Sequence, residues 1–308
     1  MSSPEDAWSG SHIGFTTGLS TISREGEKRG KRIYSVEYLE GKSVKNLKIL
    51  CEALVNRVNL DGTTATGANF TFGGKQYDVA AKREVILCGG TIKTPQILEL
   101  SGIGDPDVLK SAGVEVRAKN KGVGANLQDH AATSLCVDVV DGVFTLDRFN
   151  EHPELAKAGV AEYITSRTGI FSNGFAVTGF LPFKELVSPA ELEDTIRSIR
   201  RIQPTADFHK TQLDEIVKQL EDKTSANIQV AFFPLTFKAN DFAEHQGPQR
   251  PRRTAPGAGI SFLLCTAYPV SRGTVHITSS GMYCSSGGER REKGDYRRRT
   301  RDSSILPR

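Results

Sequence analysis

The stretch that most constrains the fold is residues 84–106, EVILCGGTIKTPQILELSGIGDP. Its apolar run is typical of a strand buried on both faces. The run ends at Gly89 and Gly90, where the backbone can turn sharply and a ligand can approach without meeting a Cβ atom. Thr94 as cap and Pro95 as first residue then predict a short helix. Such a β-turn-α unit suits a bound phosphate or an electron-rich ring, although it also occurs as plain structural packing.

Composition indicates an ordinary globular chain. Of the 308 residues, 38% are hydrophobic and 25% are charged, and the length allows more than one domain. No run approaches the roughly 18 apolar residues of a membrane helix, so we expect no membrane partner. The first residues lack the basic start and apolar core of a signal peptide. Localisation stays open. Secretion is the alternative if a signal peptide lies in a missing N-terminal part of the protein.

The net charge of +4 comes entirely from the end of the chain. Residues 289–308 hold seven Arg and one Lys against four acidic residues. Basic tails can bind nucleic acid, but this one has a single aromatic residue, Tyr296, and no apolar face. We therefore expect no nucleic-acid partner, and interpret residues 281–308 as a basic tail that is either disordered or not native coding sequence.

The cysteines indicate neither a metal site nor a redox motif, because none are spaced as C-x-x-C. Their odd number and mostly apolar surroundings predict buried free thiols rather than a disulfide framework. The five are Cys51, Cys88, Cys136, Cys265 and Cys284. The one Asn-x-Thr triplet, at Asn69, is a glycosylation acceptor if the protein is secreted.

Hydrophobic patterning divides the chain into an α/β segment up to about residue 130 and a mixed segment with antiparallel strands. Two alternating runs on either side of Gly73-Gly74 predict a β-hairpin. Ser188-Pro189-Ala190-Glu191 predicts a capped helix. The other predicted strands are 33–39, 47–58, 83–88, 114–119, 134–140, 227–233, 259–268 and 273–279, and the other predicted helices lie after Pro106 and near 205–222.

The spacing within residues 90–104 is more specific than the β-turn-α unit. Gly90-Thr91-x-x-Thr94-Pro95 followed by Ser-Gly-Ile-Gly resembles the second signature of the glucose–methanol–choline (GMC) oxidoreductases, a family of flavoenzymes. Five further segments resemble the family in the same order, so the likeness covers about residues 10 to 280. They are residues 12–22, 46–58, 122–130, 174–183 and 271–277.

This resemblance implies the fold: α/β plus α+β, with part of a doubly wound FAD-binding domain joined to a substrate domain that has an antiparallel sheet and flanking helices. Residues 1–140 would form a partial FAD-binding domain and residues 141–280 a partial substrate domain. The resemblance also implies FAD as cofactor and a small-molecule alcohol as substrate. In the family a histidine takes the hydroxyl proton while a hydride passes from the CH–OH carbon to the flavin.

Two family features are missing from the sequence. There is no G-x-G-x-x-G, and the likeness stops near Ser280, before the family's catalytic histidine region. We therefore expect an FAD-dependent alcohol oxidase or dehydrogenase present as an incomplete, inactive fragment. The alternative is a non-catalytic interaction or regulatory fragment of a flavoprotein, which would expose apolar surface.

The resemblance assigns cofactor contacts but no catalytic residue and no metal ligand. The backbone of Val55 matches the position that meets the adenine. The turn beside the FAD and the loop at 122–130 supply the others, namely Cys88, Gly89, Gly90, Asn126 and Asp129. His130 is expected either near the flavin or in a structural hydrogen bond with Asp129. His276 is expected as a packed or edge residue of a strand, and the other histidines as loop or surface residues: His12, His152, His209 and His245.

Overall fold

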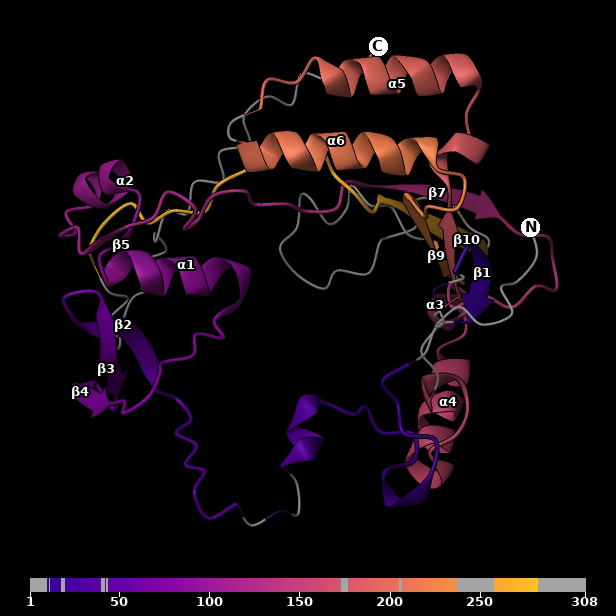
Figure 1. Ribbon diagram of the computed structural model, residues 1–308. Coiled ribbons are helices and arrows are strands. Elements are labelled where there is room, and N and C mark those ends of the chain that lie inside the picture. The colour runs from indigo at the N-terminus through magenta and orange to yellow at the C-terminus, as the bar shows by residue number, and fades with distance from the viewer. Residues whose placement is uncertain are drawn as a thin grey trace. The chain divides into compact units, whose positions relative to one another are not determined.

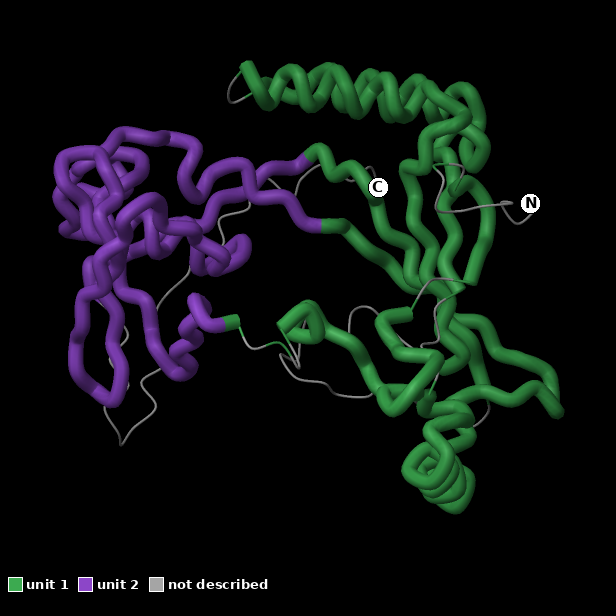
Figure 2. Tube along the Cα trace, turned by 60° about the horizontal axis from the view of Figure 1, so that its bottom comes forward, with its two compact units in different colours: residues 1–44, 130–270 green, residues 45–129, 271–308 purple. Residues whose placement is uncertain are grey.

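The computed structural model describes residues 10, 12–17, 20–39, 42, 44–172, 177–204, 207–236 and 258–281. The chain forms two compact units that alternate along the sequence (Figure 2). Unit 1 comprises residues 1–44 and 130–270, and unit 2 comprises residues 45–129 and 271–308. The predicted FAD and substrate domains, with their boundary at residue 140, stay a prediction. Residues 282–308 of the predicted tail lie outside the described residues.

Unit 2 begins with an antiparallel meander in the order β2-β3-β4 (Figure 1). Its strands are β2 Leu54–Asp61, β3 Thr64–Phe72 and β4 Lys75–Ala80. This confirms the hairpin predicted around Gly73 and Gly74, which both have the positive φ that favours glycine. The Asn69 side chain is 3% exposed, and its amide accepts from Asn56 (2.8 Å) and donates to Asp78 (3.1 Å). The glycosylation acceptor is therefore buried within the sheet.

The rest of unit 2 consists of short elements around a small core. These are α1 Gly90–Leu100, β5 Ile103–Gly104, α2 Pro106–Ser111 and β6 Ala118–Lys119. Strands β5 and β6 pair in parallel, so only the end of the strand predicted at 114–119 forms a ladder. The predicted α2 is confirmed, and its N-cap Asp105 accepts from the backbone of Asp107. Leu109 of α2 is fully buried against Ala112 and Ile277.

Three predicted strands are wrong. Residues 35–38 form a 3-10 helix, residues 83–88 form no strand, and residues 273–279 contribute only a bridge between Leu127 and Gly273. Apolar and β-branched residues favour a strand only where a neighbouring strand supplies hydrogen bonds and packing. Without one, Ile86 is 73% exposed. The predicted burial of the thiols is also wrong for the three exposed ones, Cys51, Cys88 and Cys136.

Unit 1 is built on a five-stranded antiparallel sheet in the order β1-β8-β9-β10-β7. The strands are β1 Gly14–Thr17, β7 Ala132–Asp138, β8 Val177–Leu181, β9 Ile228–Phe233 and β10 Gly259–Thr266. All four pairings are antiparallel, which confirms the strands predicted at 134–140, 227–233 and 259–268 and their orientation.

Helices complete unit 1. They are α3 Arg148–Glu151, α4 Pro153–Ser166, α5 Pro189–Arg200 and α6 Asp207–Glu221, with 3-10 turns at Gly26–Lys28, Ser35–Tyr38, Ile170–Ser172 and Phe183–Glu185. Ser188 and Glu191 form the predicted capping box at the start of α5. Helices α5 and α6 lie side by side (Figure 1) and enclose an apolar cluster: Ile196, Ile199, Leu213, Ile216 and Val217. His209 of α6 is buried, so its predicted surface position is wrong.

Candidate functional site

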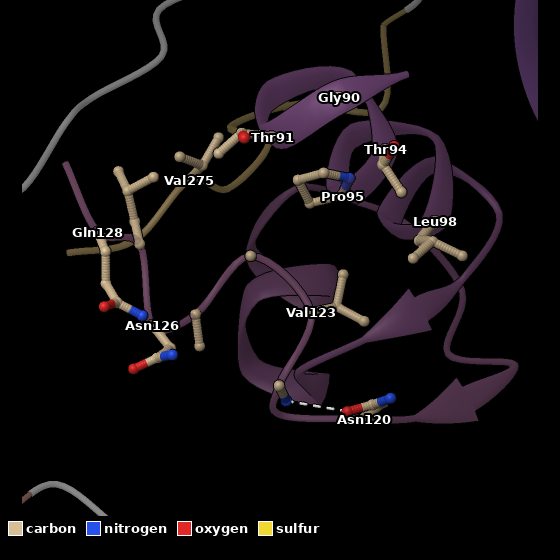
Figure 3. A pocket seen from close by; sticks show the side chains of 14 residues that line it. Gly90, Thr91, Thr94, Pro95, Leu98, Asn120, Val123, Asn126, Gln128 and Val275 are labelled. Carbon is tan, nitrogen blue, oxygen red and sulfur yellow. Dashed lines mark hydrogen bonds between the residues drawn. The ribbon is translucent and has the colours of Figure 1, made fainter. Parts of the chain in front are cut away.

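A pocket of about 750 Å³ lies within unit 2, between α1 and the loop at residues 120–128 (Figure 3). Helix α1 contributes Gly90, Thr91, Thr94, Pro95 and Leu98. The loop contributes Asn120 and residues 122–128, and Val275 completes the lining. The two walls come from the segments that the sequence singled out, the glycine turn and the Gly-rich loop.

The first wall is the N-terminus of α1. Its N-cap is Gly89, which has no side chain to accept from the first-turn N–H groups. Gly90 has φ +73°, and a Cβ atom added there would meet nothing within 4 Å. The helix starts at Gly90, five residues before the predicted Pro95, which therefore lies inside α1 rather than at its first position. The pocket therefore meets a helix N-terminus at a position without a side chain.

The second wall is the loop, whose conformation is stabilised by hydrogen bonds to its asparagine side chains. Asn120 Oδ1 accepts from the backbone N–H of Gly122 at 2.9 Å, the bond dashed in Figure 3. Asn126 has φ +58°, a left-handed conformation that asparagine tolerates better than most residues. Arg272 Nε donates to Asn126 Oδ1 at 3.0 Å and fixes this side chain.

Residues 271–277, of which Val275 lines the pocket, bind the loop through backbone hydrogen bonds. Leu127 and Gly273 exchange backbone hydrogen bonds of 2.9 and 2.8 Å, and Val275 N–H donates to Gly124 O at 2.7 Å. At Gly124, which has φ +69°, an added Cβ atom would collide with Val275 O and the ring of His276. Glycine is thus required here by both its backbone conformation and the close approach.

A buried carboxylate joins the same segment to α1. Glu99 is fully buried. Its Oε1 lies 2.6 Å from His276 Nδ1, and its Oε2 accepts from the backbone N–H of Ile277 at 2.8 Å. The sequence marks Glu99 as a carboxylate where the family usually has an apolar residue, but it does not reveal the partner of that carboxylate. Sequence reasoning took His276 for a strand residue, whereas the ring is the partner of this carboxylate.

The pocket brings together only part of the predicted cofactor contacts. Gly90 and Asn126 line it, and Gly89 caps the helix beside it. The other three lie in the same unit outside the lining: Val55 in β2, the exposed Cys88 before the turn, and Asp129 after the loop. The role of all six as FAD contacts stays a prediction.

The remaining histidines do not gather at the pocket. His130 is exposed and follows the loop. The ring of His12 meets Phe180 edge-on, and exposed His152 pairs with Glu154 at 3.1 Å. His245 lies outside the described residues.

No group of three His, Cys, Asp or Glu side chains among the described residues is arranged to hold a metal ion. No helix in the part of the chain that the structure describes is long and apolar enough to cross a membrane.

Comparison with known proteins identifies relatives. Residues 4–132 match the family model of GMC oxidoreductase. A dehydrogenase from Monascus purpureus is 31% identical over 291 residues, which cover 90% of this chain and 47% of that protein. An oxygen-dependent choline dehydrogenase from Pectobacterium atrosepticum is 37% identical over 170 residues, 53% of this chain and 30% of that protein. The chain thus spans about half or less of the length of these curated relatives.

Solved structures agree with the sequence relatives. The formate oxidase of Aspergillus oryzae superposes with a TM-score of 0.66 at 24% identity, covering 87% of this chain and 42% of that one. A pyridoxine 4-oxidase from Mesorbium loti gives a TM-score of 0.56 at 19% identity, covering 88% of this chain and 40% of that one. At this identity the likeness shows the fold, and it confirms the predicted fold class.

Proposed function

The chain belongs to the GMC oxidoreductase family, which uses FAD, and we propose that it serves an enzyme that oxidises the CH–OH group of a small-molecule alcohol. FAD, when bound, supplies the acceptor for the hydride that leaves the alcohol carbon. The chain's part in this reaction is to bind and orient the cofactor through the pocket of unit 2.

One observation carries this proposal: the side-chain-free start of α1 opens onto the pocket. The first-turn N–H groups and the positive end of the helix dipole favour an anionic or electron-rich group. The open space at Gly90 lets such a group approach the backbone directly. The pocket volume of about 750 Å³ is in the range of small-molecule sites. The residues present therefore fit part of a flavin nucleotide, which Gly90, Thr91 and the loop around Asn126 would hold.

The test is a titration of FAD with the full 308-residue chain and two matched variants. Gly90→Ala places a methyl group in the pocket. Gly74→Ala is the control, because Gly74 has a similar φ of +76° and also has open space around it, but lies in the hairpin of unit 2. We expect Gly90→Ala to weaken FAD binding by about tenfold or more, while Gly74→Ala binds like the native chain. Equal affinities of the two variants would contradict the proposed site.

We also propose that the 308 residues bind FAD weakly and do not oxidise alcohols by themselves. The sequence contains no G-x-G-x-x-G, the motif that holds the FAD pyrophosphate in doubly wound domains. In addition, no histidine lines the described pocket. Reduction of an electron-accepting dye by an alcohol, in the presence of this chain and FAD, would disprove the second part.

A second candidate function is a non-catalytic interaction, and exposed apolar residues of unit 2 favour it. Ile49, Leu50, Ile86 and Ile92 are all more than half exposed. Surface of this kind promotes association with other proteins. Sedimentation velocity combined with an FAD titration distinguishes the two candidates, because a stable monomer that binds FAD supports the oxidoreductase, whereas a stable monomer that binds no FAD supports the interaction role.

A further inference from the structure

Residues 271–277 contact the loop that forms one wall of the pocket and helix α1, whose N-terminus forms the other wall, although they lie far from both in the sequence. Three backbone hydrogen bonds join them to the loop, between Leu127 and Gly273 and from Val275 to Gly124. His276 and the backbone of Ile277 join them to Glu99 of α1, across 177 and 178 residues. The relative position of the two walls thus depends on this segment.

The buried carboxylate determines where the segment lies. A carboxylate removed from water is unfavourable unless donors satisfy it. Glu99 has no exposure and receives two bonds, one on each oxygen, from consecutive residues of the segment. A shift of the segment by one residue would remove His276 and Ile277 from these oxygens together. Glu99 therefore selects one register of the segment against α1.

The same register of residues 271–277 also determines the position of the loop at 122–128. Val275, which directly precedes His276, donates to Gly124 O, and Gly124 lies so close that only glycine fits. Arg272 adds a side-chain bond to Asn126 at the other end of the loop. Neither Glu99 nor His276 lines the pocket, so each acts on it through neighbouring residues.

We propose that Glu99 and His276 form a clamp that positions the loop at 122–128 against the N-terminus of α1 and thereby sets the affinity of the pocket for its ligand. The ligand, FAD, rests on the proposed function, whereas the clamp is a property of the chain itself. Glu99 and His276 are positioning residues in this assignment.

Hydrogen–deuterium exchange of the full chain tests the clamp without any ligand. The reporters are the amides of Leu127, Gly273 and Val275, whose bonds join the loop to the segment. We expect Glu99→Met to raise their exchange rates about tenfold or more, since bonds to a buried charged group are lost. The hairpin β2–β4 of the same unit should keep its native protection.

Two further variants distinguish a specific effect on the loop from general misfolding of unit 2. Glu99→Gln keeps an oxygen that accepts from Ile277, so we expect it to retain more loop protection than Glu99→Met. Glu115→Gln is the matched control, because Glu115 belongs to unit 2 but its side chain is 76% exposed. Native loop protection in Glu99→Met, or equally raised exchange throughout unit 2, would overturn the proposal.

A double variant tests whether the two residues act as one unit. His276→Leu alone leaves the buried carboxylate with a single donor. Glu99→Met combined with His276→Leu replaces the pair by two apolar side chains, which is often better tolerated than half of a buried polar pair. We expect the double variant to exchange less than the sum of the single effects. Simple additivity would count against a clamp.

FAD titrations of the same variants separate the clamp from the proposed function. We expect the affinity to fall about tenfold in Glu99→Met and less in Glu99→Gln, in the order of their loop exchange. Native affinity in a variant whose loop exchanges freely would overturn the inference. If the native chain binds no FAD, the proposed function fails, and the exchange data alone decide on the clamp.

Discussion

Replacing Gly124 by alanine should destabilise unit 2 far more than the same change at another left-handed glycine. Gly124 has φ +69°, and a Cβ atom there would lie 2.6 Å from His276 Nδ1 and collide with Val275 O. Gly74 has φ +76° with nothing within 4 Å of the added atom. The pair of variants therefore separates the backbone penalty, which both share, from the collision, which only Gly124→Ala produces.

The expected magnitudes follow from the contacts. A left-handed conformation costs a non-glycine residue about 1–2 kcal/mol, partly offset by about 0.4–1 kcal/mol from the stiffer unfolded chain, so Gly74→Ala should lose about 1 kcal/mol. At Gly124 the segment must also move. That movement breaks the hydrogen bond from Val275 to Gly124 O, which contributes about 1 kcal/mol. It also weakens the two hydrogen bonds to the Glu99 carboxylate, which contribute about 1.5–3 kcal/mol each. Gly124→Ala should therefore lose about 2–4 kcal/mol more than Gly74→Ala.

Urea unfolding followed by far-ultraviolet circular dichroism measures the difference, provided that the transition of unit 2 is identified by exchange of the β2–β4 amides. The slope of the transition should stay constant, so that a change in midpoint reports stability. If the two variants lose the same free energy of unfolding, residues 275–276 can move aside for a methyl group without cost. That result would refute the argument that they fix the position of the loop.

Three other features give measurable predictions. Ser188→Ala should cost about 1 kcal/mol of stability by removing the capping box of α5, while Ser198→Ala on the exposed face of that helix should be near neutral in thermal unfolding. Asn69 should stay unglycosylated in folded chain offered to an oligosaccharyltransferase, and a glycan detected there by mass spectrometry would contradict its burial in the sheet. Burial raises the pKa of the Cys265 thiol, so less of it is thiolate at a given pH and it should react with iodoacetamide more slowly than exposed Cys88; equal rates would contradict this.

Local sequence signals predicted the elements that carry their own stabilisation. The hairpin at Gly73-Gly74 follows from turn residues flanked by alternating strands, and α5 follows from its Ser-x-x-Glu box. The strand predicted at 83–88 has only apolar residues in its favour, and no described strand pairs with it. Where a partner decides the conformation, the residues of one segment cannot predict it.

The candidate site divides in the same way. Its two walls were recognisable because each has a local cause: glycines at a helix start, and Gly and Asn residues with positive φ in the loop. The contact between Glu99 and His276, which connects the two walls, was not recognisable, because the two residues are 177 positions apart in the sequence. In the sequence, Glu99 departs from the family's usual apolar residue at that position, but nothing pairs it with His276, which is one histidine among six. A carboxylate at a usually apolar position nevertheless requires a buried donor or an exposed position, and the structure supplies the donor. The search for positioning residues in such chains can therefore start from charged residues at apolar positions of the helix that meets the ligand.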